Sequence, residues 1–333
     1  MKGKRLFKVI IMLFLCVFAL PSNYTDVEAD EMVEDFYIYP LTVDSENWFD
    51  YTVKEKSEML KIDETILSNM SDRQLVYAIA DYPYLCDIYL YGVSISDGID
   101  QVKQYCSALG ELSKRTSFHE SLEKYGTEII NRCIEETSDW KRFNCLEAMN
   151  DLIEFSKGNC SHLHESTDNK EYNSTKAAPT VPYYLYPEDH TANQHLYWDY
   201  NQVLNVYNII SYDRIGSCRY NCHSYAWYSQ LATNIYWIPD PTGYTTSGNY
   251  SQLYGGNVSS SIYTIGMSVG DIIFYQSGNT STMHSVLFVG NPSNGAPLAD
   301  ATVQSKWGSY GVFTHRLTEV PVGYDYTYIS IWH

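Results

Sequence analysis

The chain has 333 residues, of which 44% are hydrophobic, and its 22 Lys and Arg against 40 Asp and Glu give a formal net charge of −18. This acidic balance argues against nucleic acid as a partner, because binding to phosphates needs cations that displace condensed counterions. The length and the hydrophobic share predict two domains, each with a modest core of its own.

The first residues have the pattern of a secretory signal peptide over 1–29. Basic residues within 1–8 precede the apolar run VIIMLFLCVFAL, which is too short for a membrane span, and small residues follow up to Ala29. We expect cleavage there and a secreted protein that is extracellular or associated with the cell wall. The C-terminal sequence YDYTYISIWH has no hydrophobic tail, so no stable membrane anchor is predicted.

Helical periodicity dominates the next part and predicts a helical domain over 30–160. Ser71 and Gln74 form a possible capping box ahead of an apolar stripe, and Pro83 is expected to stop that helix. Further stripes of apolar residues at helical spacing run along 99–112, 129–134 and 146–153. This half is therefore predicted to be a helical bundle.

The sequence changes character at a predicted linker, 161–180, which is polar and nearly free of large apolar side chains. The following residues, 181–333, are rich in Tyr, Gly, Ser and Thr and contain short apolar runs that are typical of strands: DIIFY, SVLFVG, GVFTH and YTYISIW. A further strand is expected over 301–308, and a helix near Cys222. The sequence therefore predicts an α+β protein, with an antiparallel sheet in the second half.

Two residues of this second half have the chemistry of a nucleophile and a base. The sequence RYNCHSYAWYSQ at 219–230 places Cys222 at the expected start of a helix, where backbone N–H groups favour a thiolate and can hold an oxyanion. We expect the pKa of Cys222 to fall below the roughly 8.5 of a free cysteine. His284 opens the strand HSVLFVG, a rigid support from which an imidazole can take and return a proton.

A helix cysteine followed by GDIIFY and then HSVLFVG resembles the papain-like NlpC/P60 and CHAP superfamily of secreted cysteine peptidases and amidases, many of which cut peptidoglycan peptides. The resemblance covers residues 215–315 and implies a papain-like fold for the C-terminal domain. It implies that Cys222 is the nucleophile and His284 the base. A polar residue on the next strand orients the base in that superfamily, which makes Gln304 and Ser305 the candidates here.

We therefore predict a secreted cysteine hydrolase that cleaves amide bonds, with bacterial cell-wall peptides as the expected substrate and partner. The Cys222 thiolate adds to the carbonyl, and His284 protonates the leaving amine and then activates water. Backbone N–H groups near 222 and 223 hold the oxyanion, and Tyr220 and His223 are expected to line the cleft. The mechanism needs no metal and no organic cofactor, and none is predicted.

Other interpretations of the two central residues stay open. Cys222 is alternatively a core residue or the disulfide partner of Cys218, and His284 a hydrogen-bonded strand histidine. His315 is a second candidate for the base. The rival function is a catalytically inactive module that binds peptide or glycan through aromatic loops. A hydrogen bond between the Cys222 sulfur and the His284 ring would favour the enzyme.

The remaining cysteines allow two readings as well. Without Cys16 of the predicted signal peptide, seven cysteines remain, and an odd count leaves at least one thiol unpaired. The other six form three bridges in an oxidising habitat or stay reduced otherwise. Cys160, His162 and His164 are metal-ligand types, but they lie at the linker edge without a fourth ligand nearby, so we interpret them as part of a solvated polar stretch.

Overall fold

The structure is a computed structural model, and it describes residues 36–90, 95–135, 140–159, 178–188, 190–258, 266–275, 283–290, 297–324 and 328–333. The predicted signal peptide and most of the predicted linker lie outside the described residues, as do Cys160, His162 and His164. Residues Phe36–His333 form one compact unit.

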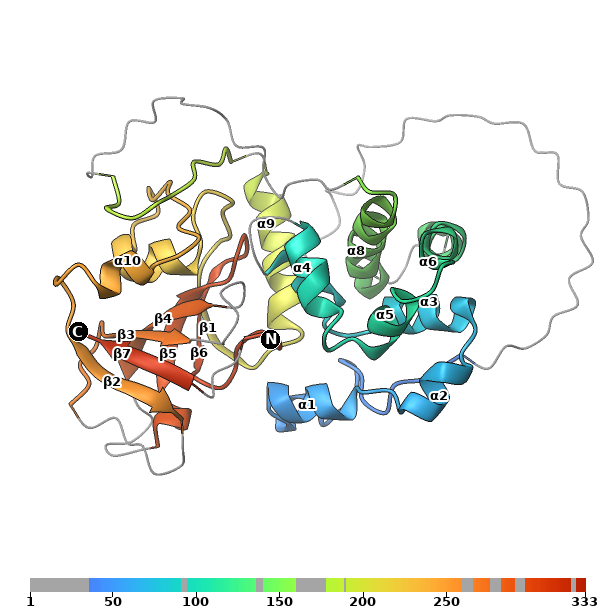
Figure 1. Cartoon of the computed structure of the whole chain (residues 1–333), viewed down its shortest axis with the longest axis horizontal. Helices are drawn as coiled ribbons and strands as arrows, with labels where there is room; N and C mark the ends of the chain where they lie inside the picture. Colours follow the sequence, from blue (N-terminus) through green and yellow to red (C-terminus); the bar gives the residue numbers. More distant parts are fainter. Residues whose placement is uncertain are drawn as a thin grey trace, which may run out of the picture. The chain divides into compact units, whose positions relative to one another are not determined.

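Short helices make up the N-terminal half of this unit (Figure 1). In the described residues they are η1 (Trp48–Asp50), α1 (Val53–Met59), α2 (Glu64–Asn69), α3 (Asp72–Ala80), η2 (Leu85–Tyr89), α4 (Ile95–Val102), α5 (Ser107–Leu112), α6 (Phe118–Ser121), η3 (Leu122–Gly126), α7 (Thr127–Glu135) and α8 (Trp140–Ser156). The predicted helical character of this half is confirmed.

One of two predicted helices is present as expected, and the other is divided in two. The capping box of Ser71 and Gln74 is present at the start of α3, which ends before Pro83 as expected. The stripe over 99–112 is not one helix, because the chain turns between α4 and α5. At this turn a Cβ on Gly110 would lie 2.7 Å from the carbonyl oxygen of Lys103. Glycine, which has no Cβ, therefore allows α5 to pack closely against the end of α4.

The C-terminal half contains helical segments and an antiparallel sheet. The helical segments are α9 (Ala192–Trp198), η4 (Asp199–Leu204), η5 (Ser224–Tyr228), α10 (Thr242–Thr245) and η7 (Leu298–Asp300). The strands are β1 (Ile209–Arg214), β2 (Gln252–Asn257), β3 (Ile272–Tyr275), β4 (His284–Gly290), β5 (Thr302–Lys306), β6 (Val312–Arg316) and β7 (Tyr328–Trp332). The α+β class is confirmed, and so are the five strands expected from sequence; β1, β2 and α9 were not expected.

The strand order in the sheet is β1-β6-β5-β4-β3-β7-β2. The central strand β4 pairs with β3 along its first part, from Tyr275 opposite His284 to Ile272 opposite Leu287. Its pairing with β5 starts later, at Leu287 opposite Gln304. The first residues of β4 therefore lie at the end of the β4–β5 ladder, where other side chains can approach the backbone.

Each face of the sheet has its own apolar packing. The face that carries Ile272 and Phe274 packs against Tyr225 and Trp227, next to Cys222. The other face, which carries Ile273 and Tyr275, belongs to the large core that also contains the N-terminal helices. The predicted N- and C-terminal domains thus share one continuous core among the described residues.

Hydrogen bonds support this shared core. The Trp48 indole N–H donates to the carbonyl oxygen of Val206 at 2.8 Å, and the Tyr207 hydroxyl donates to Asp87 at 2.7 Å. The Tyr324 hydroxyl donates to the carbonyl oxygen of Leu90 at 2.9 Å. All three bonds are buried and join segments far apart in the chain.

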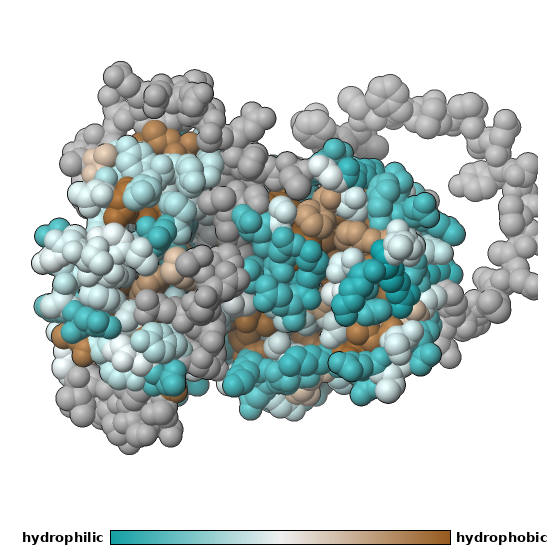
Figure 2. Space-filling view, viewed as in Figure 1, coloured by the Kyte–Doolittle hydropathy of each residue, from teal (hydrophilic) through white to brown (hydrophobic). Residues whose placement is uncertain are grey.

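The two halves differ in surface character. On the face drawn in Figure 2, strongly hydrophilic residues gather over the helical half, whereas the sheet half is mostly pale, in keeping with its Tyr-, Ser-, Thr- and Gly-rich sequence. Within the described residues, every helix is too short or too polar to cross a bilayer.

Candidate functional site

Cys222 is the first residue of a short helical turn that continues as η5, as the sequence predicted. Asn221 caps this turn, because its Oδ1 accepts the backbone N–H of Ser224 at 3.1 Å. The same side chain is fixed to Ile238, whose N–H donates to Oδ1 and whose carbonyl accepts from Nδ2 at 2.7 Å. The position of Cys222 is therefore set by a buried asparagine whose Oδ1 and Nδ2 are both hydrogen-bonded.

The Cys222 sulfur lies at the start of β4. Backbone N–H groups of Ser285 and His223 lie near the sulfur and favour its thiolate. The side chain is only 5% exposed, and this burial raises the pKa of Cys222 to about 11, although the N–H groups and the charge of Lys306 act to lower it. The expectation of a pKa below about 8.5 is wrong, because desolvation of the thiolate outweighs its stabilisation by N–H groups.

His284 belongs to a buried hydrogen-bond network centred on Ser305. His315 Nδ1 donates to the carbonyl oxygen of Arg316 at 2.8 Å, so its Nε2 carries a lone pair and accepts the Ser305 hydroxyl at 2.8 Å. The Ser305 oxygen in turn accepts the Trp307 indole N–H at 2.9 Å and has one acceptor position left. His284 Nε2, 3.2 Å away, fills it as a donor.

The network favours one tautomer of His284, although the Trp307 indole N–H also lies 3.3 Å from His315 Nε2. With its proton on Nε2, the ring presents an unprotonated Nδ1, which is buried and has no hydrogen-bond partner among the described residues. Burial, followed by the nearby His315 and His223, lowers the pKa of His284 well below its usual value, so the ring is neutral at neutral pH. Its ring stacks on Tyr324, with ring centres 4.5 Å apart.

The two predicted residues meet the first residues of β4 from different sides. The helical segment that follows Cys222 packs on the face of Phe274. His284, paired with Tyr275, presents its ring to the opposite face, against Tyr275 and Tyr324.

Ser285, whose backbone N–H lies near the Cys222 sulfur, directly follows His284 in β4, and its own side chain contacts His223 and Trp227. Because Nδ1 has no partner in the described part of the chain, the thiol–imidazole hydrogen bond that would favour the enzyme is not formed in this structure. Both groups are neutral at neutral pH, because burial raises the pKa of the Cys222 thiol and lowers that of the His284 ring.

Only one of the two candidate orienting residues contacts His284. Ser305 does, whereas the adjacent Gln304 points to the other face of β5, because strand side chains alternate. The side-chain Oε1 of Gln304 accepts a hydrogen bond from the Tyr225 hydroxyl at 2.5 Å, and its Nε2 donates to Asp213 at 3.0 Å. Gln304 as a catalytic residue is therefore not supported by its position.

The two residues expected to line a cleft are buried. His223 is 4% exposed, and its Nδ1 lies 2.7 Å from the Ser285 hydroxyl, which also accepts the Trp227 indole N–H. Tyr220 is 1% exposed and lies under the Lys306 ammonium, 5.1 Å from the ring centre. Neither side chain lines an open surface, and only the backbone N–H of His223 keeps its predicted place at the sulfur.

His315 and Trp307 both hydrogen-bond to Ser305, a role that the sequence did not indicate. His315 was considered as a second base, but it acts here as the acceptor that orients the Ser305 hydroxyl. Trp307 was not singled out, although it stands two residues after Ser305 on the same side of the strand. That spacing was the available signal, since side chains at positions i and i+2 share a face.

Five cysteines carry thiols rather than disulfide bonds: Cys86, Cys106, Cys133, Cys218 and Cys222. A bridge between Cys218 and Cys222 is therefore absent. The Cys218 sulfur instead lies 3.2 Å from His190 Nδ1.

Cys218 belongs to a group that sequence reasoning missed. Glu188, His190, His195 and Cys218 have potential ligand atoms within 4.8 Å of one another. The signal was a glutamate and two histidines within eight residues, but the distant cysteine gave no hint of its place.

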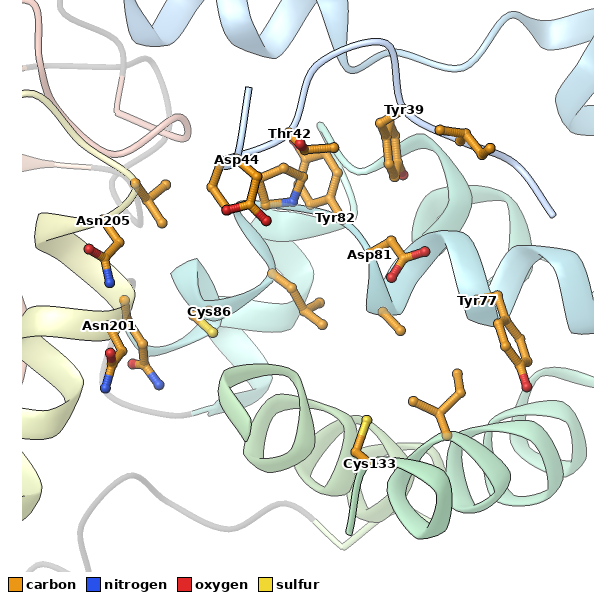
Figure 3. Close-up of a pocket in the computed structure, with 18 of the residues that line it drawn as sticks. Tyr39, Thr42, Asp44, Tyr77, Asp81, Tyr82, Cys86, Cys133, Asn201 and Asn205 are labelled. Atoms are coloured by element: carbon orange, nitrogen blue, oxygen red, sulfur yellow. The ribbon is translucent and has the colours of Figure 1, made fainter. Parts of the chain in front are cut away.

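A separate pocket of about 660 Å³ lies among the helices and does not include the predicted site residues. Figure 3 shows Cys133 from α7 and Asp81 after α3 at this pocket, with Asn201 of η4 and Asn205, the residue after η4, on another side.

The raised pKa predicts how Cys222 reacts with an alkylating reagent. Because the thiolate is the reactive form, the rate of carbamidomethylation should rise about tenfold per pH unit between pH 7 and 10, without a plateau. Peptide mass spectrometry of iodoacetamide-treated folded protein measures this rate. A plateau near pH 6 would reveal a thiolate–imidazolium pair and contradict the neutral resting state.

No family model, curated protein or solved structure matches the chain, so the resemblance to the NlpC/P60 and CHAP superfamily stays a prediction.

Proposed function

We propose that the protein is a secreted cysteine hydrolase of papain-like type, with Cys222 as nucleophile and His284 as general base. The observation that carries the proposal is the setting of the His284 ring. Its Nε2 contacts Ser305, its buried Nδ1 has no hydrogen-bond partner among the described residues, and the next residue of the strand, Ser285, has its backbone N–H near the Cys222 sulfur.

The reaction follows from these two groups. Nδ1 of His284 takes the thiol proton as the Cys222 sulfur forms a bond to the amide carbon. The carbonyl oxygen becomes an oxyanion, for which the N–H groups of His223 and Ser285 are available once the sulfur turns to substrate. The imidazolium gives its proton to the leaving amine, and water then hydrolyses the thioester with His284 as base.

The substrate is proposed to be a peptide amide. Peptidoglycan peptides are the first class to test, on the strength of the resemblance of residues 215–315 to wall-cutting enzymes. The test is to incubate the full mature chain with purified peptidoglycan and with a generic protein, and to identify new amino termini by mass spectrometry. New termini in either substrate support hydrolysis, and their identity gives the bond that is cleaved.

Ser305 is expected to act as a positioning residue. A Ser305→Ala variant loses the acceptor that holds the His284 tautomer, and we expect kcat to fall roughly 10- to 100-fold with little change in KM. Steady-state kinetics on a peptide substrate measure both constants.

Gln304→Ala is the matched control, since it alters the neighbouring residue on the opposite face of β5. It should keep the kcat of the wild type. Equal losses in both variants would indicate a general effect of strand β5 and not a role for Ser305.

Binding without catalysis is the second candidate function. It is favoured by the burial of both central side chains, with His284 fully buried and Cys222 5% exposed, and by the absence of a hydrogen bond between them among the described residues. This candidate predicts that peptidoglycan or peptide is retained on the protein without any new amino terminus, and that Cys222→Ser binds as well as the wild type.

A further inference from the structure

Four side chains of different types converge beside the loop that leads to Cys222. Glu188 and His190 precede α9, His195 lies in its first turns, and Cys218 lies between β1 and Cys222. His195 and Cys218 are almost completely buried. The potential ligand atoms all lie within 4.8 Å of one another.

Two pairs within this cluster are already in contact. His195 Nε2 lies 2.8 Å from a Glu188 oxygen, and His190 Nδ1 lies 3.2 Å from the Cys218 sulfur. Donor atoms around a tetrahedral zinc ion with bonds of about 2.0–2.3 Å lie roughly 3.3–3.8 Å apart. The two pairs need to approach each other by only about 1 Å to reach that geometry.

The loop that carries Cys218 packs closely against His195, and Gly216 makes this contact possible. A Cβ on Gly216 would lie 2.8 Å from His195 Nδ1 and 2.7 Å from the carbonyl oxygen of Ser309. Lys306 holds the same loop from the other side, by donating to the carbonyl oxygen of Ser217 at 3.0 Å. The Ser217 hydroxyl donates to the second Glu188 oxygen at 2.6 Å, so the carboxylate is oriented by a neighbour outside the ligand set.

The donor set selects the kind of metal. One thiolate and two imidazoles exclude calcium and magnesium, which take oxygen ligands. A set of two nitrogens, one sulfur and one carboxylate oxygen suits zinc, and the two negative ligands neutralise its charge in a buried place. We propose that Glu188, His190, His195 and Cys218 form a structural zinc site.

The metal links α9 to the loop four residues before Cys222. All four coordination positions are filled by the protein, which is the arrangement of a structural and not a catalytic zinc. Bound zinc fixes the approach to Asn221, the cap of the turn that starts with Cys222. This role does not depend on whether Cys222 is a nucleophile.

The test is the metal content of the full mature chain without an affinity tag, loaded with zinc sulfate, desalted and measured by inductively coupled plasma mass spectrometry. We expect about one zinc per chain in the wild type and a loss of that zinc in Cys218→Ser and His190→Ala. Cys222→Ser, a change of the same kind four residues away, should retain it.

A second measurement on the wild type keeps the test informative if the variants fold poorly. Cobalt(II) in place of zinc should give a thiolate-to-cobalt charge-transfer band in the near ultraviolet, and zinc should raise the Tm by several degrees relative to protein treated with EDTA. A wild-type chain that retains no metal and gives no such band would overturn the proposal. So would well-folded Cys218→Ser protein with undiminished zinc.

Discussion

A Cys222→Ser variant is expected to lose hydrolytic activity by at least about 10⁴-fold in kcat, because a serine hydroxyl cannot replace a thiol as nucleophile without a stronger base. The change is nearly isosteric, and Asn221 fixes the turn through bonds that do not involve the sulfur. The fold should therefore be retained. Initial rates of amine release from a peptide substrate or peptidoglycan measure the effect.

Cys133→Ser is the control for this experiment. It makes the same change at a buried cysteine of α7, away from the sheet, and should keep wild-type rates. If Cys222→Ser and wild type cleave equally fast, Cys222 is not the nucleophile, and the buried thiol belongs to the core as the alternative interpretation held.

A Trp48→Ala variant is expected to lose about 3–5 kcal/mol of unfolding free energy. The indole is completely buried in the shared core, and its N–H donates to the carbonyl oxygen of Val206. The Lys56 ammonium lies 4.7 Å from the centre of the indole ring. Because Val206 precedes β1 and Trp48 lies in the helical half, the loss should shift the unfolding of both halves. Urea unfolding followed by circular dichroism and by tryptophan fluorescence measures this.

Trp48→Phe separates packing from hydrogen bonding. It keeps most of the ring and loses only the bond to Val206, so a cost of about 1 kcal/mol is expected. Two separate transitions, of which only one moves in Trp48→Ala, would contradict a cooperative core and favour the two independent domains predicted from the sequence.

Features that depend on nearby residues were predictable from the sequence. The capping box of Ser71 and Gln74 and the apolar runs of β3, β4, β6 and β7 rest on local patterns, and the structure contains them. The helix start at Cys222 was predictable for the same reason, since Asn221 is a favoured N-cap residue.

Features that depend on tertiary packing were not predictable. Alternation along β5 implies that Gln304 and Ser305 face opposite ways, but it does not tell which of them meets His284. The pKa of Cys222 was predicted in the wrong direction because the start of a helix is visible in the sequence, whereas the burial of the sulfur is not. The approach of Cys218 to Glu188 likewise depends on how the loop before Cys222 packs on α9.

The most direct test of the proposed mechanism is the covalent intermediate at Cys222. Wild-type protein is mixed with a peptide substrate, quenched with acid during turnover, digested and examined by mass spectrometry for an acyl group. The account predicts a thioester on Cys222 that disappears in Cys222→Ser and decays to free enzyme and product acid if the quench is delayed. Release of product with no acyl group on Cys222, or with an acyl group on another residue, would contradict it.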